Sequence, residues 1–395
     1  MKKATQQQTK EHNRNLVLKT IFDHHSVSRA EIARITSLTR TTVSDIVADL
    51  IEQGLVSEIG MGSSQGGKNP ILLSLVEDSR YLIGVDLAQS RFMGAVVNLR
   101  GKIRSIVSQP VIDRSGDEAL NAIFKILDRL VGEALLPIVG IGVGTPGLVN
   151  TNKGLVVNAV NLEWHNLPLA HLLQDRYHLP AYVLNDSQAA AMGEYNYGEG
   201  HLSDRNMVVI SARHGIGAGI IINQQLFQGD GGGAGEIGHI VVVPEGGKRC
   251  RCGNYGCLET VASTQALIQQ AQSLAAQAGG AFPDGNKIDL EAIQQAFQAG
   301  NPQIQPLVLN TARYMGLAIA GLVETLNIQK IVVSGDMTGF GKPWLDVVQE
   351  TVSRNTLSRL SGDTRVEFGQ LGENCIILGA SAMLVNNYPL LFTNH

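Results

Sequence analysis

Residues 235–259 read Gly-Glu-Ile-Gly-His-Ile-Val-Val-Val-Pro-Glu-Gly-Gly-Lys-Arg-Cys-Arg-Cys-Gly-Asn-Tyr-Gly-Cys-Leu-Glu and carry the most specific signal in the chain. They place one imidazole, His239, and three thiols, Cys250, Cys252 and Cys257, within nineteen positions. Three thiolates and a neutral histidine make a complete tetrahedral donor set for Zn²⁺, with no open position for an activated water. The sequence therefore predicts one structural zinc ion per chain and no catalytic metal.

The only other cysteine is Cys375, which stands far from this group in the sequence. Thiols that cluster in this way favour metal binding over disulfides in a reducing compartment. The alternative is a set of unliganded thiols in a glycine-rich loop. The cations Lys248, Arg249 and Arg251 surround the thiols, and we expect them to lower the thiol pKa values.

The sequence on both sides of this loop is typical of an α/β protein. Buried strands are predicted upstream at 81–87 and 93–99 and from Ile103 onward, and a similar series follows at 207–211, 219–223 and 226–228. This repetition predicts two similar lobes, residues 76–200 and 201–395, with a ligand cleft between them. The second lobe is expected to contain a long helix at 307–326, a strand at 330–334 and a closing helix from about Leu378.

Residues 1–75 predict a winged helix-turn-helix with a glycine-rich wing. Ser28 and Glu31 form a capping box at the start of one helix, and Thr39 can cap the next, which ends at Gly54. The apolar residues of that second helix fall on one stripe, namely Val43, Ile46, Val47, Leu50 and Ile51. A further helix around Ile21 supports the pair. Strands are predicted at 55–59 and 71–75.

The opposite face of the second helix carries small or hydrogen-bonding side chains that fit a major groove. Five basic residues among the first twenty add positive charge nearby. We therefore predict operator DNA as a partner, contacted by Arg29, Thr39, Arg40, Thr41, Thr42 and Ser44, and by Lys68 of the wing. Asp45 and Asp49 limit phosphate contact to the start of the helix. The alternative is that the helical hairpin is only a packing module.

The composition narrows the class of protein further. The chain has 395 residues, of which 44% are hydrophobic and 17% charged, and its net charge is −4. This length exceeds one compact core, and the charge excludes a polycation that coats nucleic acid, so any DNA contact is local. There is no run of about 18 uninterrupted apolar residues, so no membrane partner is expected and the predicted location is cytoplasmic.

Glu236-Ile-Gly-His239 followed by Cys-x-Cys-Gly-x-x-Gly-Cys-x-Glu resembles the signature of the ROK family of sugar kinases and sugar-responsive repressors. The resemblance covers nearly the whole chain and includes Gly144-Thr-Pro-Gly147, Leu184-Asn-Asp186 and Ser334-Gly-Asp336. It implies a duplicated, actin-like (ribonuclease H-like) two-lobed sugar-kinase fold. The N-terminal winged helix is similar to the repressor branch, and most of all to xylose-type repressors.

The resemblance also implies a sugar site formed by Gly147, Asn185, Asp186, Glu236, His239 and Glu259. Carboxylates accept hydrogen bonds from sugar hydroxyls, and an amide can both donate and accept. His239 can hold zinc through one ring nitrogen and a hydroxyl through the other. Each carboxylate also has a local alternative: Asp186 can cap the following helix, Glu236 can be a solvated loop residue, and Glu259 can start a helix.

Both phosphate-binding loops of the family's kinases are altered. Where those kinases have Asp-x-Gly-Gly-Thr, this chain has Asp86-Leu-Ala-Gln-Ser90; where they have Gly-Thr-Gly-Ile-Gly, it has Arg213-His-Gly-Ile-Gly217. Side chains replace glycines that let phosphates approach the backbone. Asp186 would be the general base of a kinase, but here we predict no enzyme activity and expect Asp186 only to accept a hydroxyl.

The sequence thus predicts a sugar-responsive repressor of carbohydrate-utilisation genes. It is expected to act as a homodimer, with a tetramer also open, and to leave its operator when a monosaccharide binds between the lobes. Xylose is the first expectation for that sugar, and glucose or an N-acetylhexosamine the next. Two alternatives stay open: an ATP-dependent sugar kinase, and a repressor controlled by a protein partner that sequesters it.

Overall fold

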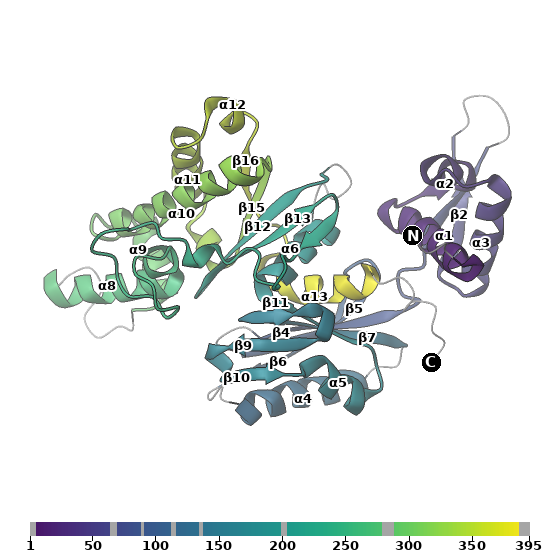
Figure 1. Cartoon of the computed structure of the whole chain (residues 1–395), viewed down its shortest axis with the longest axis horizontal. Helices are drawn as coiled ribbons and strands as arrows, with labels where there is room; N and C mark the ends of the chain where they lie inside the picture. Colours follow the sequence, from purple (N-terminus) through teal and green to yellow (C-terminus); the bar gives the residue numbers. More distant parts are fainter. Residues whose placement is uncertain are drawn as a thin grey trace.

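The computed structural model describes residues 5–63, 69–87, 91–111, 116–133, 137–198, 204–278 and 288–386. Figure 1 shows a small N-terminal head beside two larger lobes, each built on its own sheet. The mixed α/β architecture with two lobes agrees with the fold class predicted from the sequence.

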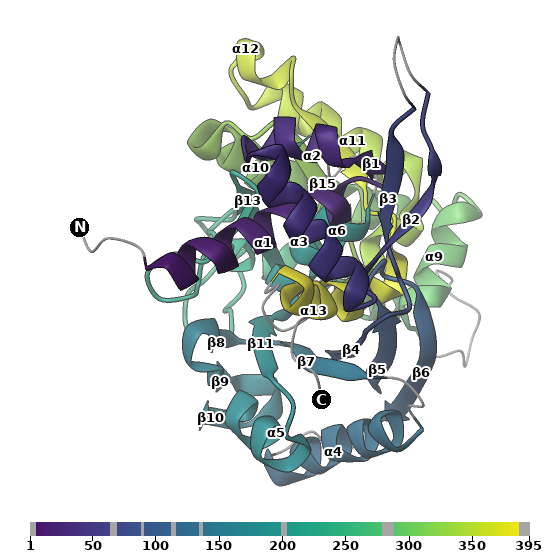
Figure 2. The ribbon, with the colours of Figure 1, turned by 90° about the vertical axis from the view of Figure 1, so that its right-hand side faces the viewer.

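The head consists of α1 (Gln6–Asp23), β1 (Val27–Ser28), α2 (Arg29–Thr36), α3 (Arg40–Glu52), β2 (Val56–Met61) and β3 (Ile71–Leu75). Ser28 caps α2 through the predicted capping box with Glu31, and the Thr39 hydroxyl accepts from Thr42 N at the start of α3. Ser37 ends α2 in the left-handed region at φ 56°. Figure 2 shows β2 and β3 extending together away from the helices. The short strand β1, which the sequence did not predict, pairs with β3.

The first lobe runs through β4 (Tyr81–Asp86), β5 (Arg91–Asn98), β6 (Ile103–Pro110), α4 (Gly116–Gly132), β7 (Ile138–Thr145), β8 (Leu148–Asn150), β9 (Leu155–Ala159), β10 (Trp164–Leu167), α5 (Leu169–Tyr177) and β11 (Ala181–Asn185). Its main sheet has the order β11-β7-β4-β5-β6. Strands β4, β5 and β6 form an antiparallel meander. Strand β7 is parallel to β4, and β11 is parallel to β7. Helices α4 and α5 pack against one face.

The second lobe contains β12 (Met207–Ala212), β13 (Ile216–Ile222), β14 (Gln225–Phe227), α7 (Glu259–Ala262), α8 (Thr264–Ala278), α9 (Leu290–Gln298), α10 (Ile304–Leu326), β15 (Lys330–Ser334), α11 (Lys342–Arg354), α12 (Ser358–Ser361) and β16 (Arg365–Phe368). Its sheet order, β14-β13-β12-β15-β16, has the same topology as the first sheet: a meander followed by two parallel strands. The predicted duplication is therefore present. Apolar residues of α10 and α11 cover one face of this sheet.

Two helices, α6 (Asp186–Tyr197) and α13 (Cys375–Asn386), cross from one lobe to the other. Helix α6 leaves the first sheet and packs on β12 and β13, whereas α13 leaves the second sheet and packs on β4 and β7 (Figure 1). The expectation that the closing helix belongs to the second lobe is therefore wrong. Helix α13 is apolar on nearly all sides, so its sequence does not indicate which sheet it covers.

Close approach of α13 to the first sheet depends on glycine. A Cβ at Gly142 would lie 2.0 Å from the Ala380 carbonyl oxygen, and one at Gly84 would lie 2.1 Å from that of Ile377. These oxygens belong to helix backbone, so neither can move without shifting α13 as a whole. The two glycines therefore set the distance between helix and sheet.

We expect Gly142→Ala to lower the free energy of unfolding by about 3 kcal/mol, because the added methyl group would meet helix backbone that cannot move aside locally. Thermal unfolding followed by circular dichroism measures this. Gly321→Ala in α10 is the matched control, since a Cβ there meets nothing within 4 Å. It should be neutral or stabilising by up to about 1 kcal/mol. Equal midpoints for the two variants would contradict the close packing of α13.

Within the described ranges, α10 is the one helix long and apolar enough to cross a membrane. Half of its most apolar stretch is buried inside the protein. Val308, Met315 and Ile319 on its inner face belong to the core of the second lobe. Its apolar character is accounted for by this packing.

Candidate functional site

The head presents the start of α3 to solvent. Arg40, Thr41 and Ser44 are exposed, whereas the opposite stripe from Val43 to Leu50 is buried. Thr42 is half-buried, and its hydroxyl lies 2.8 Å from that of Thr39. The helix therefore carries an exposed polar face whose first turn is basic.

Arg29, another predicted DNA contact, is bonded within the head. Arg29 lies 2.9 Å from Glu58 and is half-buried, so an ion pair holds its guanidinium to the wing. Asp49 pairs with Arg14 at 3.1 Å, which offsets one of the acidic charges near the helix. Lys68 lies outside the described residues.

Arg100, which the sequence gave no reason to single out, joins the head to the first lobe. It follows β5, and its guanidinium donates to the carbonyl oxygens of Phe22 and His24 at the C-terminal end of α1. The guanidinium also lies 5.4 Å from the centre of the Phe22 ring. A cation at a helix C-terminus offsets the partial negative charge of the last carbonyls. The hydrophobic core of the head also continues into Val139 and Leu384 of the lobe and α13.

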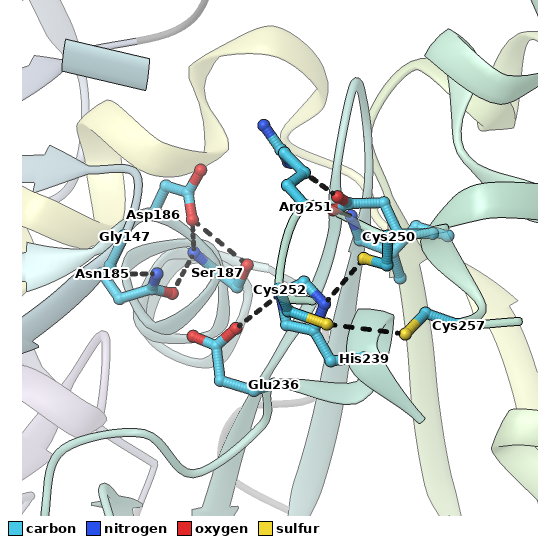
Figure 3. A network of polar contacts seen from close by, with 12 residues as sticks. Gly147, Asn185, Asp186, Ser187, Glu236, His239, Cys250, Arg251, Cys252 and Cys257 are labelled. Carbon is cyan, nitrogen blue, oxygen red and sulfur yellow. Dashed lines mark hydrogen bonds and ion pairs between the residues drawn. The ribbon is translucent and has the colours of Figure 1, made fainter. Parts of the chain in front are cut away.

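The four predicted metal ligands come together in one group. The candidate ligand atoms of His239, Cys250, Cys252 and Cys257 all lie within 4.8 Å of one another. His239 Nδ1 is 3.5 Å from Cys250 Sγ, and the sulfurs of Cys252 and Cys257 are 3.7 Å apart (Figure 3). Four such atoms surround a volume suited to one tetrahedral ion, and three sulfurs with one nitrogen fit Zn²⁺. The residues present therefore fit a structural zinc.

The prediction that nearby cations lower the thiol pKa values is wrong: two of the three pKa values are raised, and no cation is among the main causes of any of the three shifts. Burial raises the pKa of Cys250 and raises that of Cys257 to about 12. The pKa of Cys252 is lowered, chiefly by a hydrogen bond from the backbone of Asn254. Arg251 turns away toward Glu259 and Asn161. Metal binding must therefore displace protons from buried thiols.

Asn185 and Gly147 form a fixed edge next to the start of α6. Asn185 is the N-cap of that helix: its Oδ1 accepts from Ser187 N at 2.9 Å and from Gln188 N at 3.3 Å. Its Nδ2 donates to the Gly147 carbonyl oxygen at 3.0 Å. Gly147 has φ 93°, and a Cβ there would lie 2.3 Å from the Asn158 carbonyl oxygen. These bonds hold the two residues in place.

Asp186 is the first residue of α6 and not its cap, because Asn185 has that role. Its Oδ1 accepts from Ser187 N at 2.7 Å, which fixes the carboxylate. Burial raises the pKa of Asp186, and Arg213 opposes this change. Burial also raises the pKa of Glu236, with further contributions from the carboxylates of Asp186 and Glu259. The three carboxylates therefore face a common region.

Glu236 connects this region to the metal group. Its Oε2 lies 3.8 Å from His239 Nε2, while Nδ1 of the same ring faces the Cys250 sulfur. Figure 3 shows Glu236 between the Asn185–Asp186 end of the network and the imidazole. One ring nitrogen of His239 thus faces the cysteines, and the other faces Glu236. This arrangement lets a metal on Nδ1 orient the Nε2 side.

Both carboxylate oxygens of Glu259 accept hydrogen bonds from the protein itself. It starts α7 and is buried, its Oε2 accepts from Ile216 N at 3.2 Å, and its Oε1 accepts from Arg251 at 2.7 Å. Arg251 also donates to Asn161 Oδ1 in the first lobe at 2.7 Å. Glu259 therefore holds Arg251 between the lobes, a role that the sequence did not indicate.

The altered phosphate loops are only partly described. Ala88, Gln89 and Ser90 lie outside the described residues. Asp86 is 1% exposed and ends β4. Arg213 in the other loop reaches across to it, with Nη1 3.2 Å from Asp86 Oδ2. The guanidinium of Arg213 is thus paired with a carboxylate of the first lobe.

Known proteins resemble this chain over nearly its full length. The model of the ROK family matches residues 82–387. The xylose repressor of Caldicellulosiruptor bescii is 33% identical over 387 residues, which cover 96% of each chain.

Two solved structures resemble this chain to different extents. A ROK family transcriptional regulator described as a homologue of Escherichia coli Mlc matches 97% of this chain and 98% of its own, with TM-score 0.84 and 28% identity. A ROK family glucokinase from Streptomyces griseus, in complex with glucose and AMPPNP, matches 77% of this chain and 98% of its own, with TM-score 0.70 and 29% identity. The regulator thus accounts for nearly the whole chain, and the kinase for about three quarters of it.

Proposed function

The chain belongs to the ROK family. From that premise we propose that it is a transcriptional repressor whose affinity for operator DNA is lowered by a monosaccharide bound between the lobes. The observation that carries this proposal is the joining of an exposed helix-turn-helix face to a two-lobed sugar-kinase fold through one continuous core. A change in how the lobes close can therefore reach the reading head.

The connection runs along α13. Near its start, the buried Cys375 thiol donates to the Ala190 carbonyl oxygen of α6 at 3.2 Å, so α13 is held to the other crossing helix. Near its end, Leu384 and Val385 pack in the core that includes Val17 and Leu50 of the head. Helices of this length move as rigid rods, so a shift at one end displaces the other. A sugar that favours one lobe geometry would then change the position of α3.

The proposed sugar site consists of Gly147, Asn185, Asp186, Glu236, His239 and Glu259. The bonds within the site hold Asp186 and Asn185 at fixed positions, and zinc on His239 would orient the imidazole. Xylose is the first candidate, because the relative at 33% identity is a xylose repressor. We further propose that the protein works in the cytoplasm as a homodimer, with Arg40, Thr41 and Ser44 of each head facing one half-site.

We expect Asp186→Asn to weaken binding of the inducing sugar about 10- to 100-fold while leaving operator binding unchanged. The amide keeps the shape but loses the charge-assisted hydrogen bond, which contributes about 1.5–3 kcal/mol. Calorimetric titration with a panel of aldoses and footprinting on the protein's own promoter region measure the two activities. Asp175→Asn, at an exposed pair on α5, is the control. Loss of operator binding in Asp186→Asn alone would contradict the assignment.

An ATP-dependent sugar kinase is the second candidate, favoured by the likeness to the Streptomyces griseus glucokinase and by the presence of Asp186. Incubation with ATP, Mg²⁺ and the aldose panel tests it directly. We expect no sugar phosphate. Robust turnover would overturn the absence of enzyme activity and leave the DNA-binding proposal to be judged by footprinting.

A further inference from the structure

Arg251 lies within the loop of the metal group, but its guanidinium reaches the other lobe. In the chain it stands between Cys250 and Cys252, and its side chain points away from their sulfurs (Figure 3). Its Nε and Nη2 donate to Glu259 Oε1 at 3.1 and 2.7 Å. Its Nη1 donates to Asn161 Oδ1 of the first lobe at 2.7 Å. All three guanidinium nitrogens are therefore bonded, and these bonds form a bridge between the lobes.

The second-lobe end of the bridge is held in place by the fold. The Glu259 side chain is only 10% exposed, and its Oε2 accepts from Ile216 N at 3.2 Å. A Cβ at Gly215 would lie 2.6 Å from that oxygen, so the glycine leaves room for the carboxylate. An ion pair between two exposed side chains contributes little, but here the acceptor is shielded and fixed. The planar guanidinium of Arg251 is thus held in one orientation.

The first-lobe end of the bridge lies next to the proposed sugar site. Asn161 belongs to the 3₁₀ helix Val160–Leu162, which directly follows β9. Leu162 is fully buried in the core of the first lobe. Ala159, at the end of β9, packs on Gly147: a Cβ at Gly147 would lie 2.7 Å from the Ala159 Cα. The bridge therefore ends on the segment that supports Gly147.

We propose that Arg251 is a positioning residue that ties the metal-binding loop to the first lobe and thereby favours the arrangement of the lobes that a sugar needs. This inference rests on the proposed function, because the proposed sugar site takes residues from both lobes. A ligand that contacts both lobes binds only while they face each other, and its apparent affinity falls with the fraction of molecules in that state. Loss of the bridge lowers this fraction without removing any residue of the sugar site.

Amide hydrogen exchange tests the bridge without a ligand. We expect Arg251→Met to speed exchange in residues 155–167 of the first lobe about fivefold or more, although the substituted residue belongs to the second lobe. Arg249→Met removes an exposed cation from the same loop and is the matched control, with unchanged exchange. A folded Arg251→Met protein that exchanges like Arg249→Met in these residues overturns the proposal.

Substitutions at Asn161 test the bridge from its other end. Asn161→Ala should speed exchange in residues 248–258 of the metal-binding loop, and it replaces Arg251→Met if that variant fails to fold. Asn161→Asp keeps an oxygen acceptor for Arg251 and should retain the slow exchange of the unmodified protein. Fast exchange in Asn161→Asp, or unchanged exchange in Asn161→Ala, contradicts the bridge.

Calorimetric titration with the aldose panel tests the role in sugar binding. Arg251→Met and Asn161→Ala should each weaken binding about fivefold or more, since coupling between sites is commonly about 5- to 150-fold. The double variant should lose no more than either single variant, and metal content should stay unchanged. Additive losses, an unchanged sugar affinity, or loss of metal contradicts the proposed role. If no aldose binds the unmodified protein, the proposed function fails, whereas the exchange results still decide whether the bridge exists.

Discussion

Cys257→Ala is expected to remove zinc from the protein and, with it, most of the sugar affinity. Cys257 is fully buried and provides one of only four donors in the group. Structural zinc ions contribute about 10–16 kcal/mol of apparent binding free energy, so losing one donor of four leaves the loop without its main constraint. His239 would then lose the metal on Nδ1, and its Nε2 would no longer be held toward Glu236.

Zinc content is measured on protein purified under reducing conditions, before and after dialysis against a chelator, and sugar binding by calorimetry. Changing groups that orient a metal ligand commonly costs about 10- to 100-fold, and loss of a ligand should weaken sugar binding at least that much. Cys375→Ala is the matched control, because Cys375 is equally buried but lies outside the group. It should retain one zinc per chain. A zinc-free but normally sugar-binding Cys257→Ala protein would separate the metal from the pocket.

Arg40→Glu should abolish specific operator binding, with an affinity loss of about 100-fold or more. Arg40 is the first residue of α3 and is exposed, so nothing within the head has to rearrange. Loss of a good base contact costs about 1–3 kcal/mol, and a carboxylate in its place adds repulsion from the phosphates. Gel-shift titrations at several salt concentrations measure both the affinity and its salt dependence.

Lys342→Glu makes the same change of charge on α11, where the side chain is 80% exposed, and serves as the control. Its operator affinity should stay within about twofold of the unmodified protein, since exposed charges beyond a Debye length are screened. Arg40→Glu should also bind the inducing sugar normally. If both charge variants weakened operator binding alike, the effect would come from net charge, and the assignment of α3 as the reading helix would fail.

Much of this architecture is local enough to be visible in the sequence. The four candidate metal donors lie within nineteen positions, so a single loop can bring them together. The capping box of Ser28 with Glu31 acts over one helical turn. The strand meander can be recognised in both lobes because each copy is a series of adjacent hairpins. In each case the interacting groups are neighbours in the chain, and their spacing alone fixes the geometry.

Contacts between distant segments depended instead on the folded chain. Arg213 and Asp86 are 127 positions apart, and Arg100 meets α1 across 78 positions. Burial raised the pKa values of Cys250 and Cys257, whereas the neighbouring cations in the sequence had suggested lower values. In the sequence, Gly142 is an ordinary strand residue; only the packing of α13 against it shows that a larger side chain does not fit.

The sequence by itself therefore determined the head, the duplicated lobes and the composition of the metal group. Only the tertiary structure decided that α13 covers the first sheet and that a guanidinium joins the two lobes at Asp86. The physical reason is that side-chain periodicity and spacing specify which face of an element is buried, whereas the partner of that face is chosen by chain topology.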